Sequence, residues 1–180
     1  MTMPSEIFCG ERQVTGVSAA FCAKASPLPA ERFVATSPDG EEVESWIVRP
    51  AGFEEGATYP ALLTIHGGPF TQYGNKFFDE VQVYARAGYA VLYSNPRGSS
   101  GYSEAWGRAI RGPVGGGDGW GSLDYTDLMA VVDTALEQFG FIDGERLGVL
   151  GGSYGGYMTS WIVGHTDRFK AACSERAVNN

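Results

Sequence analysis

The sequence predicts an α/β fold built on a mostly parallel sheet with helices on both of its faces. Three observations lead to this prediction. Two β-type segments come first, joined by the turn sequence Ser37-Pro-Asp-Gly40. Apolar strand-like and helix-like segments then alternate along the chain, and one of these strands leads directly into a serine flanked by glycines. Such alternation is typical of a parallel sheet covered by helices.

Each element follows from its own pattern. The expected strands are 31–36, 43–50, 59–66, 89–94, 146–150 and 169–173. The expected helices are 78–87, 124–139 and the segment after Ser153. The continuous apolar run in 59–66 suits a strand buried on both faces, whereas 124–139 has one apolar helical face. The glycine-rich segment 95–121 is predicted to be a long loop, and loops of that length are usually functional.

The amino-terminal segment has a different character. Residues 1–25 are short, mixed and turn-like, and Ser26-Pro-Leu-Pro29 then interrupts the pattern as a linker does. We therefore expect two parts. Residues 1–26 are predicted to be the remnant of an upstream domain with its linker, and 27–180 the body of a single folded domain.

Composition excludes several classes of function. The formal charge of −8 and the absence of a basic cluster argue against a nucleic-acid partner. Three scattered cysteines, Cys9, Cys22 and Cys173, indicate neither a disulfide framework nor a zinc site, so no metal and no cofactor is expected. Without a leader-like start or a run of about 18 apolar residues, the chain is expected to be soluble and cytoplasmic, with no membrane partner.

Gly151-Gly-Ser-Tyr-Gly155 matches the nucleophile elbow, in which a strained strand-to-helix turn exposes a serine hydroxyl. Gly151 and Gly155 are expected to let the strand and the helix pass close together. The amide of Tyr154 would then donate to an oxyanion. A phosphate loop is disfavoured because the G-x-G-x-x-G and Gly-Lys-Ser/Thr patterns are absent. A turn without function remains open on this motif alone.

A second motif, His66-Gly-Gly-Pro69, follows the expected strand 59–66. In an α/β-hydrolase fold this position supplies the other half of the oxyanion hole. The donating amide must come within about 3 Å of the oxyanion and a side chain would block the substrate, so Gly68 is the expected donor. The alternative is a simple turn that begins with a hydrogen-bonded histidine. The two motifs together predict an α/β-hydrolase fold.

The serine also needs a base, and the sequence holds only two histidines. His165 lies 12 residues after Ser153 on the same expected helix, roughly 18 Å along its axis, which is too far. His66 precedes the serine, whereas the chain order of this fold is serine, acid, histidine, although its strand should neighbour the serine strand. We therefore expect a partial α/β-hydrolase fold, truncated at the carboxyl end, with the acid and the base beyond Asn180.

Several segments together resemble the prolyl oligopeptidase family of serine peptidases, in its acylaminoacyl-peptidase and dipeptidyl-peptidase-like branch. They are Ser37-Pro-Asp-Gly40, His66-Gly-Gly-Pro69, 95–102, 120–125, 151–158 and 167–172. The resemblance implies a β-propeller followed by a peptidase domain, so that 1–26 would hold the last propeller strands and 27–180 the amino-terminal part of the α/β-hydrolase peptidase domain. It also implies Ser153 as nucleophile, with the amides of Gly68 and Tyr154 as the oxyanion hole.

The leading hypothesis is a serine peptidase that hydrolyses short peptides through an acyl-enzyme on Ser153. A carboxylesterase of the same fold and an inactive truncated product are the alternatives. Four further residues are candidates for the substrate site: His66, Arg97, Glu175 and Arg176. Arg97 is expected to brace its loop rather than meet a substrate carboxylate, and an ordinary ion pair is an equal alternative for Glu175 with Arg176. Residue preference, endo or exo cleavage and oligomeric state stay open.

Overall fold

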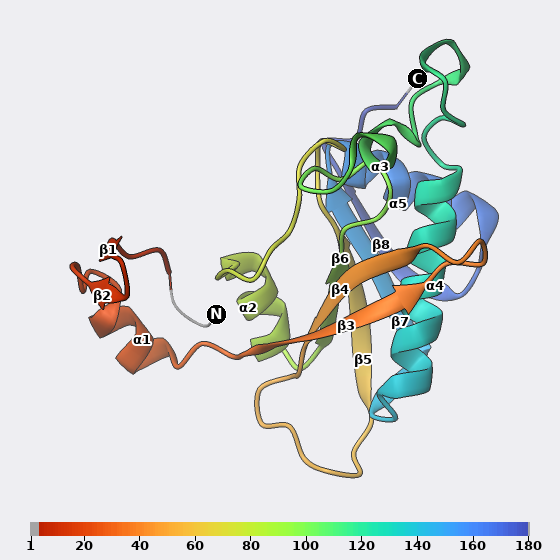
Figure 1. Cartoon of the computed structure of the whole chain (residues 1–180). Helices are drawn as coiled ribbons and strands as arrows, with labels where there is room; N and C mark the ends of the chain where they lie inside the picture. The colour runs from red at the N-terminus through yellow and green to blue at the C-terminus, as the bar shows by residue number, and fades with distance from the viewer. Residues whose placement is uncertain (1–3, 180) are drawn as a thin grey trace.

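The computed structural model describes residues 4–179, so the outermost residues of the two expected parts, 1–3 and 180, lie outside it. A six-stranded sheet forms the centre of the molecule, in the order β3-β4-β6-β5-β7-β8 (Figure 1). Its strands are β3 (Ala30–Thr36), β4 (Glu42–Val48), β5 (Tyr59–Ile65), β6 (Ala90–Ser94), β7 (Ile142–Gly152) and β8 (Phe169–Glu175). β3, β4 and β6 pair antiparallel, while β6, β5, β7 and β8 run parallel. The prediction of an initial hairpin followed by a parallel sheet is confirmed.

Helices cover both faces of this sheet, as the sequence predicts. They are α2 (Asp79–Arg86), α4 (Leu123–Gln138) and α5 (Tyr154–His165). Successive strand residues point to opposite faces. Accordingly, Trp46 and Tyr93 pack with Val81 of α2, whereas their chain neighbours Ile47 and Leu92 belong to the larger core that α4 and α5 complete.

The sheet brings the candidate residues to one edge. β5 lies directly beside β7, with Leu63 opposite Val149, which confirms the expected neighbourhood of the third strand and the serine strand. Carboxyl ends of parallel strands meet at the same edge, where ligands of such sheets usually bind. The segments that follow β5, β6, β7 and β8 therefore converge there, and these segments begin at His66, Asn95, Ser153 and Arg176.

Two local predictions were incomplete. β7 begins at Ile142 rather than at 146. Its first residues pair with β5 only where Tyr59 lies opposite Ile142, and residues 143–145 are polar or glycine, so no apolar pattern marks this part of the strand. The loop 95–121 contains a short helix, α3 (Glu104–Arg108), and a 3₁₀ turn at Pro113–Gly115. These short pieces depend on local caps, such as the Ser103 hydroxyl that accepts from the amide of Trp106, rather than on a buried apolar face.

The amino-terminal segment stands apart from the sheet (Figure 1). It holds a hairpin of β1 (Phe8–Cys9) with β2 (Arg12–Gln13), and a helix, α1 (Ala19–Ala25), that the sequence pattern did not predict. α1 has no buried residue, so it lacks the apolar stripe on which such a prediction depends. The assignment of 1–26 to an upstream domain stays a prediction. None of the helices among the described residues has the length and apolar character needed to traverse a bilayer.

Candidate active site

Ser153 lies between the end of β7 and the start of α5, at the position where the elbow motif predicts it. Its backbone has φ 60° and ψ −117°, which is a conformation that non-glycine residues rarely adopt. Such strain costs roughly 1–3 kcal/mol and persists only where the surroundings hold it. Two backbone hydrogen bonds help to do so, from Ser153 to the Glu175 carbonyl at 3.0 Å and from Tyr157 to the Ser153 carbonyl at 3.0 Å.

The glycines of the elbow are required by close backbone contacts. A β-carbon on Gly151 would lie 2.6 Å from the carbonyl oxygen of Ile65, at the end of β5. A β-carbon on Gly155 would overlap the same oxygen. Only hydrogen fits at both positions, so β7 and α5 can cross directly against the end of β5. This crossing presents Ser153 above the sheet edge.

The His66-Gly-Gly-Pro69 segment lies against the serine. A β-carbon on Gly67 would be 3.6 Å from the Ser153 β-carbon, and Gly68 has a φ of 115°, which favours glycine. Tyr154 is the first residue of α5, and the first amides of a helix have no partner within it. The structure thus brings the Gly67-Gly68 segment, Ser153 and Tyr154 together, and the binding of a developing negative charge by the amides of Gly68 and Tyr154 stays a prediction.

His66 is buried, with 7% of its surface exposed, and its ring holds the surrounding loops together. Nδ1 lies 2.7 Å from the Gly67 carbonyl oxygen and 3.2 Å from the Thr71 hydroxyl, while Nε2 lies 2.9 Å from the Ser99 hydroxyl. Burial lowers the pKa of His66 below its ordinary value, against an opposing effect of the Gly67 carbonyl. Both nitrogens are therefore engaged by loop groups rather than turned to a substrate.

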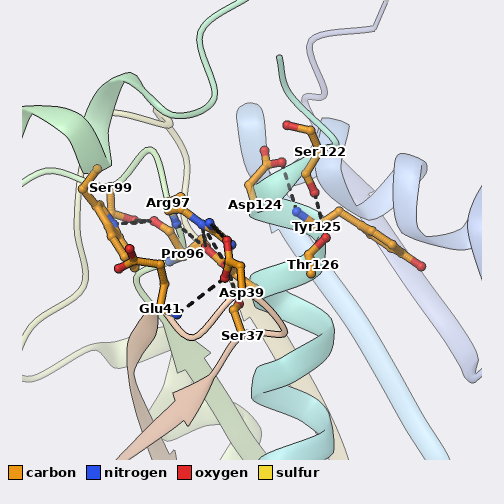
Figure 2. A network of polar contacts seen from close by, with 12 residues as sticks. Ser37, Asp39, Glu41, Pro96, Arg97, Ser99, Ser122, Asp124, Tyr125 and Thr126 are labelled. Atoms are coloured by element: carbon orange, nitrogen blue, oxygen red, sulfur yellow. Dashed lines mark hydrogen bonds and ion pairs between the residues drawn. The ribbon is translucent and has the colours of Figure 1, made fainter. Parts of the chain in front are cut away.

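Arg97 follows β6 and is also buried, with 6% of its side chain exposed. Its Nη2 donates to Asp127 Oδ1 at 2.6 Å, and its backbone amide donates to Asp127 Oδ2 at 2.8 Å. Its Nη1 pairs with Asp39 (Figure 2). Asp127 lies on α4 and Asp39 in the β3–β4 turn. The guanidinium thus joins the loop after β6 to α4 and to the β3–β4 turn. Arg97 therefore braces its loop, as expected from the sequence, and does not turn its charge toward a substrate.

Glu175 and Arg176 lie beside the serine at the end of β8. The Glu175 carbonyl accepts from the Ser153 amide, and a β-carbon on Gly152 would lie 2.7 Å from Arg176 Nη2. The two side chains form an exposed ion pair, with 2.6 Å between Arg176 Nη1 and Glu175 Oε2. Of the four substrate-site candidates, this pair is therefore the one that reaches the surface next to Ser153.

His165 ends α5, as expected, and is far from the hydroxyl along the helix. Its Nδ1 lies 2.7 Å from the Trp161 carbonyl oxygen and its ring stacks on the Trp161 ring. Both histidine rings thus contact groups other than Ser153, and the location of the base outside them stays a prediction. Among residues 4–179 no three His, Cys, Asp or Glu side chains gather as they do around a metal ion.

One contact at the site could not be read from the sequence. The Tyr154 hydroxyl donates to Asp124 Oδ2 at 2.5 Å, and neither residue is exposed. Asp124 also accepts from the amide of Gly121, and from the amide of Tyr125 at the start of α4 (Figure 2). Burial raises the pKa of the Asp124 carboxyl, although these donors oppose the shift. Tyr154 and Asp124 are 30 residues apart in the sequence, so no local sequence pattern predicts their contact.

Comparisons with known proteins agree on one family. A sequence profile of the prolyl oligopeptidase family matches residues 75–180. The peptidase YuxL of Bacillus subtilis is 46% identical over 98% of this chain, which covers 27% of that relative. Dipeptidyl-peptidase 5 of Porphyromonas gingivalis is 30% identical over 93% of this chain, which covers 24% of its length. The chain spans about a quarter of the length of the curated relatives it matches.

Solved structures show the same fold. An acylaminoacyl peptidase of Pyrococcus horikoshii superimposes with a TM-score of 0.88 and 34% identity, over 98% of this chain and 28% of its own. An acylaminoacyl peptidase in complex with Z-Gly-Gly-Phe-chloromethyl ketone has a TM-score of 0.89 and 35% identity, over the same 98% and 28%. These matches confirm the α/β-hydrolase fold that the two glycine motifs predict.

Proposed function

Because the chain belongs to the prolyl oligopeptidase family, we propose that it carries the nucleophile of a serine peptidase that cleaves short peptides. In this proposal the Ser153 hydroxyl attacks the scissile carbonyl, the peptide C–N bond breaks, and the amine leaves with the hydroxyl's proton, which gives an acyl-enzyme. Water then hydrolyses this ester, releasing the acid and restoring the hydroxyl. The amides of Gly68 and Tyr154 stabilise the negative charge that develops on the carbonyl oxygen. The observation that carries the proposal is the strained backbone of Ser153 directly beside the Gly67-Gly68 segment.

Two features support a peptide as the substrate. The relatives are named peptidases, and a similar acylaminoacyl peptidase is described in complex with a peptide-derived chloromethyl ketone. The exposed pair of Glu175 and Arg176 beside Ser153 offers both charges to the termini or side chains of a bound peptide. Because the rings of His66 and His165 are engaged by other groups, we propose that the base, like the acid, is a residue outside these 180.

The test uses the protein at its natural length. Ser153→Ala is expected to lower kcat about a millionfold on an aminoacyl amide substrate, by analogy with serine triads whose nucleophile is removed. Ser160→Ala is the matched control, because Ser160 lies on the same helix and its hydroxyl contacts the Gly156 carbonyl and Ser174. Near-normal peptidase activity in Ser153→Ala would reject the nucleophile.

The substrate class needs a separate comparison. Turnover of aminoacyl amides and of short acyl esters is measured for the same preparation. A peptidase hydrolyses both, because an enzyme that cleaves the less reactive amide also acylates from the ester. Turnover confined to esters would instead identify the carboxylesterase alternative, while leaving Ser153 as the nucleophile.

A further inference from the structure

We infer that Asp124 is a positioning residue, which holds the Tyr154 amide in the direction needed by the oxyanion hole through its hydrogen bond with the Tyr154 phenol. The inference rests on the proposed function, in which this amide is a donor. Tyr154 thus has two separate tasks, one for its backbone and one for its side chain.

The phenol and the carboxylate form a closed, buried pair. Both residues are 0% exposed, and the O–H donates to Asp124 Oδ2 across 2.5 Å, a length typical of a hydrogen bond to a charged acceptor. Asp124 is itself fixed, because it accepts from the Gly121 amide at 2.9 Å and from the Tyr125 amide at 3.0 Å. The anchor for Tyr154 is therefore the start of α4, which packs on the sheet.

A second contact holds the same region. The Trp120 ring meets the Tyr154 ring edge to face, with 5.0 Å between centroids, and the Tyr157 hydroxyl donates to the Trp120 carbonyl at 3.1 Å. A β-carbon on Gly121 would collide with the Trp161 ring. The segment 120–121 thus leads into the start of α4 and packs against Tyr154, Tyr157 and Trp161 of α5, so the Asp124 carboxylate has little freedom to follow a moving phenol.

The position of this anchor explains why it would affect the amide. The Tyr154 amide belongs to the peptide unit that joins Tyr154 to Ser153, whose φ and ψ are strained. A strained backbone relaxes unless it is held on both sides. On the upstream side β7 holds it, and on the downstream side the phenol of Tyr154 is the first side-chain anchor. Loss of that anchor would let the peptide unit rotate, and a donor displaced by about 1 Å can reduce the rate a hundredfold.

The test compares Tyr154→Phe with Asp124→Asn in the protein at its natural length. Tyr154→Phe removes one oxygen and keeps the buried ring. Each variant is expected to lower kcat about tenfold to a hundredfold with KM little changed, because an oxyanion donor acts mainly in the transition state. Affinity for a peptide aldehyde, whose adduct places an oxygen in the oxyanion hole, should fall by a similar factor. Affinity for the corresponding peptide alcohol should not change.

Tyr84→Phe is the matched control, since it also removes a hydrogen-bonded phenol oxygen, on α2, but leaves the Asp124 contact and the Trp120 contact intact. The double variant of Tyr154→Phe with Asp124→Asn should be no less active than the less active single variant, because both changes act on one bond: the first removes it and the second replaces its charged acceptor by a neutral amide. Normal kcat and aldehyde affinity in Tyr154→Phe, or an equal loss in Tyr84→Phe, would overturn the positioning role. Activity retained in Ser153→Ala would instead reject the proposed function, so the two failures are distinct.

Discussion

Asp127→Asn is predicted to destabilise the fold far more than Asp39→Asn, although both carboxylates bind the same guanidinium. The difference lies in their burial. The side chain of Asp127 is 0% exposed and that of Asp39 is 45% exposed, while the Arg97 side chain between them is 6% exposed. Asp127 also accepts from the Ser37 hydroxyl and from the backbone amide of Arg97, so it lies at the centre of the network.

The expected magnitudes follow from these environments. Removing one partner of a buried ion pair typically costs 3–5 kcal/mol, since the other charge stays buried without compensation. Arg97 keeps Asp39 in the Asp127→Asn variant, so the lower end, about 3 kcal/mol, is expected. Asp39→Asn removes only the half-exposed pair, for which about 0.2–1 kcal/mol is typical. Total domain stability is about 5–15 kcal/mol, so the first loss is a large share of it.

Urea unfolding followed by tryptophan fluorescence measures the difference. With an m-value of about 1–3 kcal/mol/M, a loss of about 3 kcal/mol lowers the midpoint by about 1–3 M. Asp133→Asn serves as the control, because Asp133 lies on the same helix α4 and its pair with Arg168 is exposed. Equal midpoints for Asp127→Asn and Asp133→Asn at an unchanged m-value would refute the assignment of a buried brace.

Two further predictions concern the elbow and the histidine beside it. Gly155→Ala should lower the free energy of unfolding by about 1–3 kcal/mol or more, because its β-carbon overlaps the Ile65 carbonyl. Gly164→Ala on the same helix, where a β-carbon meets open space, should be neutral or stabilising, and equal effects in urea unfolding would contradict the close contact. Burial lowers the pKa of His66 in the folded protein, so as the pH falls this histidine is protonated in the unfolded chain at a higher pH than in the folded one. The stability that it contributes is therefore present above the unfolded pKa of about 6.5 and should be lost as the pH falls below that value. His66→Gln should remove that part of the dependence between pH 7.5 and 5, and the same slope in both proteins would exclude it.

The fold could be predicted from the sequence because its main elements carry their own patterns. The apolar run of β5 and the apolar face of α4 are local signals of burial, and the prolines and glycines mark the turns between elements. α1 and α3 were missed for the opposite reason. Neither has a buried residue, so their helical state depends on caps and neighbouring contacts, which a hydrophobic pattern does not record.

The candidate site divides in the same way. The elbow is visible in the sequence because steric limits dictate glycine two residues before and two residues after Ser153, at Gly151 and Gly155. The His66-Gly-Gly-Pro69 segment is visible because Gly68 needs a positive φ directly after its strand. Whether these groups act as predicted in catalysis stays a prediction. The supporting contacts were not visible. Asp127 and Asp124 each lie 30 residues from their partners, Arg97 and Tyr154, so no local sequence pattern indicates either contact. Only the packing of the folded chain determines which of these side chains meet.

The first turns of α4 connect the two halves of the site. Asp124 and Asp127 are three residues apart, so they lie on one side of the helix, and both are completely buried. Asp127 fixes the loop after β6 through Arg97, and Asp124 fixes the start of α5 through Tyr154. Carboxylates near the start of a helix are favoured by its dipole, which offsets part of the cost of burying two negative charges so close together. α4 therefore holds the loop beside His66 and the turn at Ser153 in one fixed relation, although it contributes no atom to the proposed chemistry.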